Sequence, residues 1–173
     1  METLALRSGK LVTIRPIRPD DGPRLTVAYD NLSQESKYRR FLAAKPHLTS
    51  ADTRYLVNVD GVNHIALVAI AADDPELILG VARFVRHDED PGVAELAVVV
   101  GDPFQREGLA TALVARLAAA AHDVGVRRFR GTMLADNVAA DRLVRGAAAG
   151  GAIRARSLGP VKELEIDLAA PVR

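Results

Sequence analysis

One segment constrains this chain more than any other, because it passes directly from a strand pattern to a helix pattern. The segment reads AELAVVVGDPFQREGLATA and covers positions 94–112. Its first half predicts a buried strand, Val93–Val100. From about Gly108 to Val124, leucine and alanine recur with a helical period, and Gly125 is typical of a helix end. The chain therefore needs a sheet against which this helix can pack.

The start of this helix is suited to binding a diphosphate. The first N–H groups of a helix have no partner within it and carry a partial positive charge. Gly108 lets a ligand approach the backbone closely, and Ala110 keeps the first turn open. Gln105 and Arg106 could add side-chain donors. The alternative is an ordinary helix start after a loop that contains proline.

The rest of the chain alternates strand and helix signals. Helix-capping residues are expected at Asp20 or Asp21, Ser33 and Thr49. Strands are expected at Leu4–Arg7, Leu11–Arg18, His64–Ala71, Leu77–Arg86, Arg127–Leu134, Ile153–Leu158 and Val161–Leu168. A last helix is expected from Asn137 to about Ala149. This order predicts an α/β fold in which a mixed, mostly antiparallel sheet is flanked by helices.

Composition limits the class of function. The 173 residues carry 23 basic and 22 acidic side chains, a formal net charge of +1, which argues against a nucleic-acid partner. Without cysteine there is no disulfide, thiolate ligand or cysteine nucleophile, and the four histidines lack metal-like spacing. The apolar run Ile65–Ala72 is too short to span a membrane. We expect a single domain over residues 1–173, soluble and cytoplasmic, with no metal and no membrane partner.

The motif QREGLA, following AELAVVVGDPF, resembles the acetyl-CoA-binding motif of the GNAT acetyltransferase superfamily. The order of elements resembles that fold over nearly the whole chain. The segments VTIRPIRPDD, LSQESKYRRF and AELAVVV are most similar to the branch of bacterial protein lysine acetyltransferases, the Pat-like domains. The resemblance implies acetyl-CoA as co-substrate and a protein lysine as acceptor, for example on an acyl-CoA synthetase, in a monomer or homodimer. The alternatives are a small amine as acceptor, or a CoA-binding sensor or partner module with little activity.

The resemblance also implies a set of cofactor-binding residues. Main-chain groups at the end of the strand would pair with the pantetheine arm, and the loop and helix start would hold the pyrophosphate. These residues are Val98, Val99, Val100, Gln105, Arg106, Glu107, Gly108, Leu109, Ala110 and Thr111. On the later strand–helix joint, Asn137 matches an Asn that commonly contacts the cofactor. The alternative is structural, because Asp136 or Asn137 would serve equally well as a helix N-cap.

Glu95 is the candidate catalytic residue. Period-two alternation places Glu95, Ala97 and Val99 on one face of the strand. Burial in so apolar a strand is expected to raise the pKa of the carboxyl group, which suits a general base near neutral pH. In the lysine acetyltransferase branch, a Glu at the matching position deprotonates the acceptor ammonium. The alternatives are an exposed Glu on the sheet surface and an ion-pair partner for Arg83.

Two further features bear on the chemistry. Many superfamily members carry a Tyr a few residues after the Asn, and it protonates the departing thiolate. Here that stretch holds Val144, so the general acid is unidentified, and water can serve because a thiol has a pKa near 8.5. In this fold an early helix lines the acceptor groove. The matching helix here carries Tyr38, Arg39, Arg40 and Phe41. The alternative is that these residues form ordinary helix faces, with Phe41 in the core.

Overall fold

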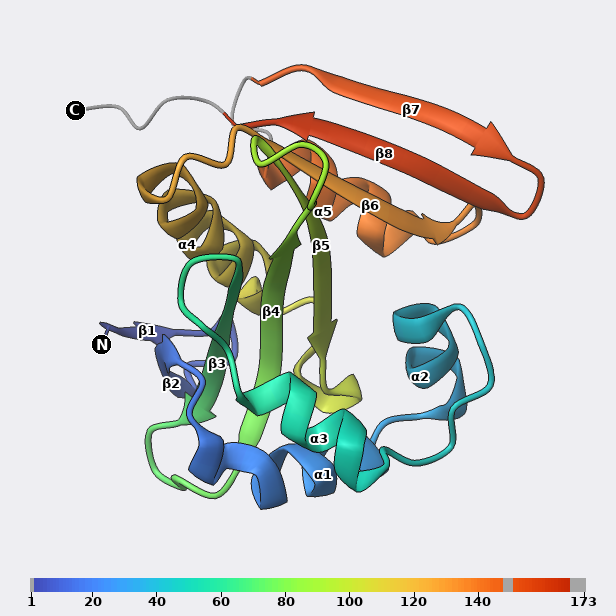
Figure 1. Cartoon of the computed structure of the whole chain (residues 1–173). Coiled ribbons are helices and arrows are strands. Elements are labelled where there is room, and N and C mark those ends of the chain that lie inside the picture. The colour runs from blue at the N-terminus through green and yellow to red at the C-terminus, as the bar shows by residue number, and fades with distance from the viewer. Residues whose placement is uncertain (1, 148–150, 169–173) are drawn as a thin grey trace.

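The computed structural model describes residues 2–147 and 151–168. Its centre is one eight-stranded sheet with the order β1-β2-β3-β4-β5-β6-β8-β7 (Figure 1). The strands are β1 Glu2–Ala5, β2 Leu11–Pro16, β3 His64–Ala71, β4 Ile78–Arg86, β5 Val93–Val100, β6 Arg128–Leu134, β7 Ile153–Leu158 and β8 Val161–Asp167. The α-helices are α1 Gly22–Asp30, α2 Gln34–Phe41, α3 Ser50–Val57, α4 Leu109–Asp123 and α5 Val138–Ala147.

The expected α/β fold is confirmed. Strands β1 to β5 form an antiparallel meander, and β6 pairs antiparallel with β8, which pairs antiparallel with β7. Only β5 and β6 run parallel. Helix α4 connects these two strands, because a parallel pair needs a crossover connection rather than a hairpin.

Two clusters of buried side chains cover the two faces of the sheet. On one face, α4 contributes Leu109, Leu113, Leu117 and Ala121, each no more than 1% exposed. Their spacing of four residues forms the apolar stripe that the sequence predicted. On the other face, α1 and α3 pack through Leu25, Leu56 and Val57. The sheet is therefore buried on both sides along its central strands.

Two of the predicted helix caps are confirmed, and one is wrong. Ser33 Oγ accepts a hydrogen bond from Ser36 N at 3.1 Å, and Thr49 forms a capping box with Asp52. The side chain of Asp21, directly before α1, makes no cap hydrogen bond to that helix, although it accepts one from Arg18 N at 2.8 Å in the preceding 3₁₀ turn. It is fully buried and instead accepts two hydrogen bonds from the Arg15 guanidinium, at 2.7 and 2.8 Å. A buried carboxylate needs a cationic partner more than a helix end needs a cap.

The first strand lies two residues earlier than the sequence predicts. It covers Glu2–Ala5 instead of Leu4–Arg7, because Leu6 already belongs to the turn. Leu6 N donates to Lys10 O, and Gly9, with a φ of 88°, donates its N–H back to Leu6 O, both at 2.9 Å. The last helix is described to Ala147, and the end that we predicted at about Ala149 lies outside the described residues.

Strand β7 forms one edge of the sheet. All six of its residues are exposed, and Figure 1 shows it at the rim, with β8 on its inner side. Arg154 projects from it and pairs with Asp167 at 2.9 Å. Within the two described ranges, no helix is long and apolar enough to cross a membrane.

Candidate active site

Strand β5 presents a different set of side chains to each face of the sheet. Ala97 and Val99 line a small cavity under α1 and α2, whereas Ala94 and Val100 pack in the cluster that includes α4. The predicted alternation is therefore confirmed, and Glu95 lies on the same face as Ala97 and Val99. We refer to this face, covered by α1, α2 and α3, as the acceptor face.

The sheet splits along β5. The parallel pairing of β5 with β6 covers three residue pairs, from Val93 with Arg128 to Glu95 with Arg130. Beyond that point β6 continues beside β8, while β5 continues beside β4 as far as Val100. Figure 1 shows the two strands diverging. The second half of β5 is thus a strand edge inside the sheet.

The main-chain groups of this inner edge follow from the register. Gly101 N donates to Leu79 O at 2.8 Å, so residues two apart in β5, including Val99, bond to β4. The intervening residues Val98 and Val100 turn their N–H and C=O groups toward the side that β6 has left. Of the three valines expected to pair with a pantetheine arm, Val98 and Val100 therefore have main-chain groups on this side, although Val100 O already accepts a hydrogen bond from Gln105 Nε2, and Val99 is directed at β4.

The loop after β5 leads into an α-helix whose first N–H groups are open. Gly108 is the N-cap of α4 and has a φ of 88°, a conformation that favours glycine. No side chain in the described part of the chain caps this end, and a Cβ at Gly108 would meet nothing within 4 Å. The N–H groups of Leu109, Ala110 and Thr111 therefore face space that an anion can enter.

The turn between β1 and β2 makes hydrogen bonds to the carbonyl groups of this loop. The Arg7 side chain donates from Nη1 to Arg106 O at 3.1 Å, and Arg7 N approaches Glu107 O at 3.4 Å. Ser8 N donates to the Glu107 carboxylate at 2.7 Å. Arg106 has a φ of 65° and Gly108 a φ of 88°, so the loop is bent at two left-handed positions separated by Glu107. The Glu107 side chain therefore stabilises the contact between this loop and the β1–β2 turn.

Gln105 is used inside the protein rather than left free for a ligand. Its Nε2 donates to Val100 O at 3.2 Å and to Ser36 Oγ at 3.3 Å. Asp102, three residues earlier, accepts hydrogen bonds from Ser33 and Ser36 at the start of α2. The loop that precedes α4 is thereby attached to the helix that covers the acceptor face.

Glu95 is partly buried. Burial raises the pKa of its carboxyl group, and the negative charge of Glu163 raises it further, while His87 and Arg130 act in the opposite direction. Within the described residues, no side chain or N–H group donates a hydrogen bond to Glu95. The Arg83 alternative gains no support, because the Arg83 guanidinium bonds to Leu56 O and His64 instead.

Asn137 and Val144 are the two positions on the later helix that were compared with family features. Asn137 lies at the start of α5, and Val144 lies within it. Asn137 is its N-cap, because Asn137 Oδ1 accepts a hydrogen bond from Ala140 N at 3.1 Å. Val144 is buried in the core, so this position supplies no hydroxyl group. The expectation that Asn137 caps the helix is confirmed, and its amide nitrogen makes no hydrogen bond to a described residue.

The early helix contributes two of its four candidate side chains to the acceptor face. Arg40 and Phe41 line the cavity with Ala97 and Val99. Tyr38 is exposed, and Arg39 pairs with Glu35 on the helix surface. Sequence reasoning missed Tyr29, whose hydroxyl donates to Lys45 O at 2.6 Å; it also lines this cavity.

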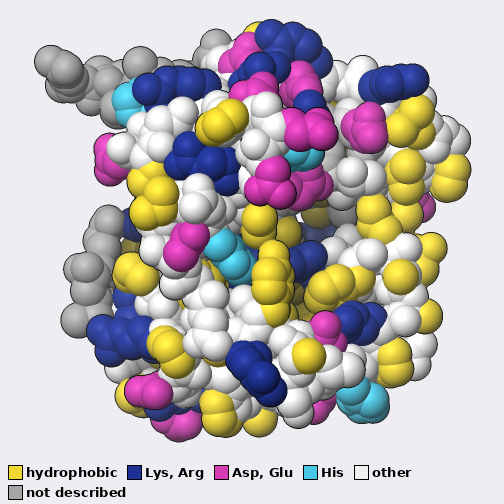
Figure 2. Space-filling view, viewed as in Figure 1, with side chains coloured by type: hydrophobic (Ala, Val, Ile, Leu, Met, Phe, Trp, Pro, Cys, Tyr) yellow, Lys and Arg dark blue, Asp and Glu magenta, His cyan; other side chains and the backbone are white. Residues whose placement is uncertain are grey.

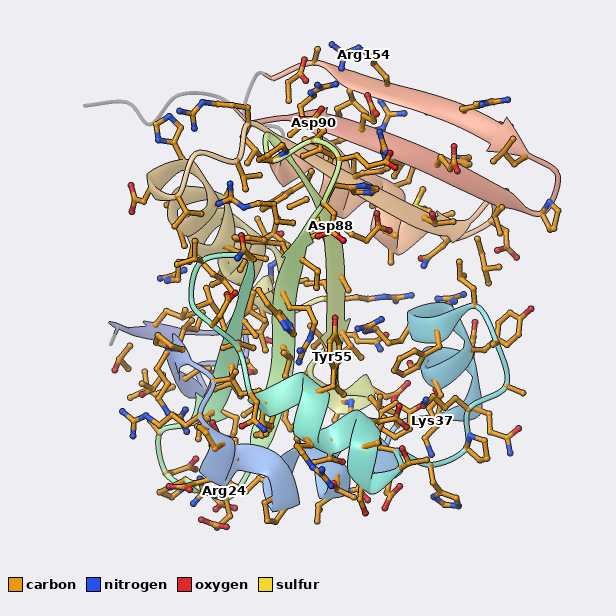
Figure 3. All side chains as sticks on the ribbon, viewed as in Figure 1. Arg24, Lys37, Tyr55, Asp88, Asp90 and Arg154 are labelled. Atoms are coloured by element: carbon orange, nitrogen blue, oxygen red, sulfur yellow. The ribbon has the colours of Figure 1, made fainter. Side chains whose placement is uncertain are left out.

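Seen from outside, the surface is hollowed between the β6–β8 half of the sheet and the α1–α3 helices (Figure 2). Acidic side chains lie above the hollow in that view, and basic and hydrophobic side chains lie below it. Asp88 and Asp90 come from the β4–β5 turn, on the upper side, whereas Tyr55 of α3 lies on the lower side (Figure 3). The two sides of the hollow therefore differ in charge.

An inner strand edge thus lies beside a helix N-terminus that an anion can approach, and the Glu95 carboxylate lies on the face covered by α1 to α3. The chain belongs to the GNAT acetyltransferase family. The family described as "Acetyltransferase (GNAT) domain" matches residues 12–147. The chain is thus an acetyltransferase domain of this family.

The relatives include named acetyltransferases. The chain is 34% identical over 140 residues to acetyltransferase Pat of Mycolicibacterium smegmatis, covering 80% of this chain and 41% of that protein. It is 31% identical over 142 residues to acetyltransferase PA5475 of Pseudomonas aeruginosa, covering 82% and 74%. The GNAT domain of S. lividans PAT superposes with a TM-score of 0.86 and 31% identity, covering 96% of each chain. The chain spans about two fifths of the length of the M. smegmatis Pat protein.

Proposed function

We propose that this domain transfers the acetyl group of acetyl-CoA to the side-chain amine of a protein lysine, with Glu95 as general base. The observation that carries the proposal is the position of Glu95. It lies on the acceptor face at the last residue pair before β5 and β6 separate, and burial raises its pKa.

Different residues bind acetyl-CoA and act on the acceptor. Acetyl-CoA supplies an activated acetyl thioester. The N–H groups at the start of α4 bind its diphosphate, and the inner edge at Val98 and Val100 binds the pantetheine arm as an added strand. Glu95 accepts a proton from the acceptor ammonium, which frees the nitrogen lone pair for attack. Because Val144 offers no hydroxyl, water protonates the departing thiolate.

The shape of the acceptor face supports a large acceptor. Two cavities on this face measure about 40 and about 30 Å³, whereas pockets that bury a small ligand measure roughly 300–1,000 Å³. A lysine on a protein loop can reach such a face without being enclosed. The exposed acidic residues Asp88, Glu89 and Asp90 on the β4–β5 turn attract a cationic side chain toward the hollow.

The relatives point in the same direction. Two of the similar proteins, from M. smegmatis and S. lividans, are named Pat or PAT, and the sequence resembles the lysine acetyltransferase branch. Spermidine N-acetyltransferase of Vibrio cholerae shares the fold at 14% identity, with a TM-score of 0.68. That likeness leaves a small amine as the alternative acceptor.

The test is an acceptor panel. The domain is incubated with acetyl-CoA and, separately, with acyl-CoA synthetases from the same cell, with polyamines and with aryl amines, and thiol release and acetyl-lysine are measured. We expect acetyl-lysine on a synthetase well above the non-enzymatic background. Efficient turnover of a small amine without any protein acetylation would contradict the lysine acceptor. Binding of CoA with no turnover of any acceptor would indicate a sensor.

A further inference from the structure

Two arginines on the acceptor face line one small cavity without an acidic partner. Arg83 extends from β4 opposite Ala97 and is 5% exposed. Arg40 extends from α2, with its guanidinium carbon 4.6 Å from the centre of the Phe41 ring. Both side chains line the cavity of about 30 Å³. Neither forms an ion pair with any residue in the ranges 2–147 and 151–168.

The hydrogen bonds of Arg83 use one of its three nitrogens and reach neutral groups. Nη1 donates to Leu56 O at 2.9 Å and lies 3.1 Å from His64 Nε2. Leu56 is in the last turn of α3, where carbonyl groups lack helix partners. Burial, together with the charge of Arg83, lowers the pKa of His64 to about 4, so its ring is neutral near pH 7. Nη2 and Nε donate to no described residue.

This arrangement is unfavourable without an anion. A buried charge is costly unless it is paired, and two cations beside one cavity repel each other. Burial and the charge of Arg40 together lower the pKa of Arg83 to about 10. Burial likewise lowers the pKa of Arg40. A carboxylate in the cavity would accept hydrogen bonds from the free guanidinium nitrogens and offset both effects.

We propose that Arg83 and Arg40 form a subsite that binds a carboxylate of the acceptor molecule, close to the amine that is acetylated. The proposal rests on the proposed transfer to an amine at Glu95. Ala97, opposite Arg83, is two residues from Glu95 on the same face, about 7 Å along the strand. On a protein acceptor, the carboxylate is an Asp or Glu side chain next to the target lysine. On a small acceptor, it is the carboxylate of an amino acid.

The experiment compares acceptors that differ in one charge. Two peptides carry the same lysine, flanked by Glu in one and by Gln in the other; 6-aminohexanoate and its amide form the small-molecule pair. For each acceptor, kcat/KM is measured from thiol release. We expect the Glu peptide to exceed the Gln peptide about tenfold, because charge-assisted hydrogen bonds contribute roughly 1.5–3 kcal/mol and 1.4 kcal/mol is a factor of ten.

The variants assign the preference to the subsite. Arg83→Gln and Arg40→Gln should each bring the ratio of kcat/KM for the Glu peptide to kcat/KM for the Gln peptide close to one. Each ratio compares two peptides with the same variant, so a general loss of activity does not change it. Arg86→Gln is the matched control and keeps the ratio. Arg86 lies on the same strand but three residues on, so its side chain faces the opposite side, where it donates to Val124 O and Pro91 O. If Arg83→Gln does not fold, the variant Arg40→Gln gives the same test, because Arg40 is only half-buried.

The outcomes separate this proposal from the lysine acceptor. The subsite is overturned if the parent protein acetylates a pair of acceptors and kcat/KM is the same for both members of every such pair. Inert peptides together with a preference for 6-aminohexanoate over its amide support the subsite and contradict the lysine acceptor. If none of the four acceptors is turned over, melting temperature decides. Glutarate, but not glutaramide, should raise it in the CoA-saturated protein, and no rise with glutarate overturns the subsite.

Discussion

The carboxylate of Asp102 accepts two hydrogen bonds from Ser33, one from its N–H at 3.0 Å and one from its hydroxyl at 2.8 Å. A third comes from Ser36 Oγ at 2.8 Å. These residues are 66 to 69 positions apart in the chain. One carboxylate thus joins the start of α2, on the acceptor face, to the loop that leads into α4.

Removing this carboxylate should loosen α2. We expect Asp102→Ala to destabilise the protein by about 1–3 kcal/mol, because it leaves the Ser33 and Ser36 donors without their acceptor. The free energy of unfolding is measured in urea. Asp73→Ala is the control, since Asp73 is 74% exposed and, among the described residues, pairs only with Lys10, so its loss should cost less than about 0.5 kcal/mol. Equal losses would mean that the Asp102 contacts add nothing.

A negative side chain at the start of α4 should abolish CoA binding. Gly108→Glu places bulk and charge where the diphosphate is expected, so CoA should no longer raise the melting temperature. Gly125→Glu is the matched control at the other end of the same helix. The two glycines have φ values of 88° and 86°, and each has open space for a Cβ. A normal CoA response in folded Gly108→Glu would remove the diphosphate assignment.

Loss of the base should slow catalysis without weakening CoA binding. We expect Glu95→Gln to lower kcat by about 10²–10⁴, with partial recovery at higher pH, where more acceptor amine is already neutral. In Glu163→Gln, the pKa of Glu95 falls because a nearby negative charge is gone, so the acid limb of the pH–rate profile should move to lower pH. A Glu95→Gln rate within twofold of the parent at pH 7 would make Glu95 structural.

The buried ion pair near α1 should govern acid stability. Burial opposes ionisation of Asp21, but hydrogen bonds from Arg15, Arg18 N and Arg24 hold its pKa below the usual 3.8. The pair therefore stabilises the fold above about pH 4, and this contribution is lost as the pH falls through the lowered pKa. Asp21→Ala should cost about 3–5 kcal/mol at pH 7. The exposed neighbour gives the control, Asp20→Ala, which should change stability by less than about 0.5 kcal/mol.

The sequence predicted the features that depend on local pattern. Apolar periodicity located the strand around Glu95 and the helix after Gly108, and it placed Glu95 on the correct face. It did not reveal the contacts of Asp102 with Ser33, or of Arg83 with His64. Those contacts join residues that are 69 and 19 positions apart, and only the packing of the folded chain brings them together. The wrong cap at Asp21 has the same cause, because its burial depends on packing.

The separation of β5 from β6 also bears on the order of events during turnover. The main-chain groups of Val98 and Val100, where the thioester is expected to bind, face the gap that β6 leaves, while the Glu95 side chain faces the α1–α3 side of the sheet. Each substrate can then enter by its own route and remain bound with the other. Initial-rate plots against both substrates should consist of intersecting lines, and the emptied coenzyme can leave without waiting for the acetylated product.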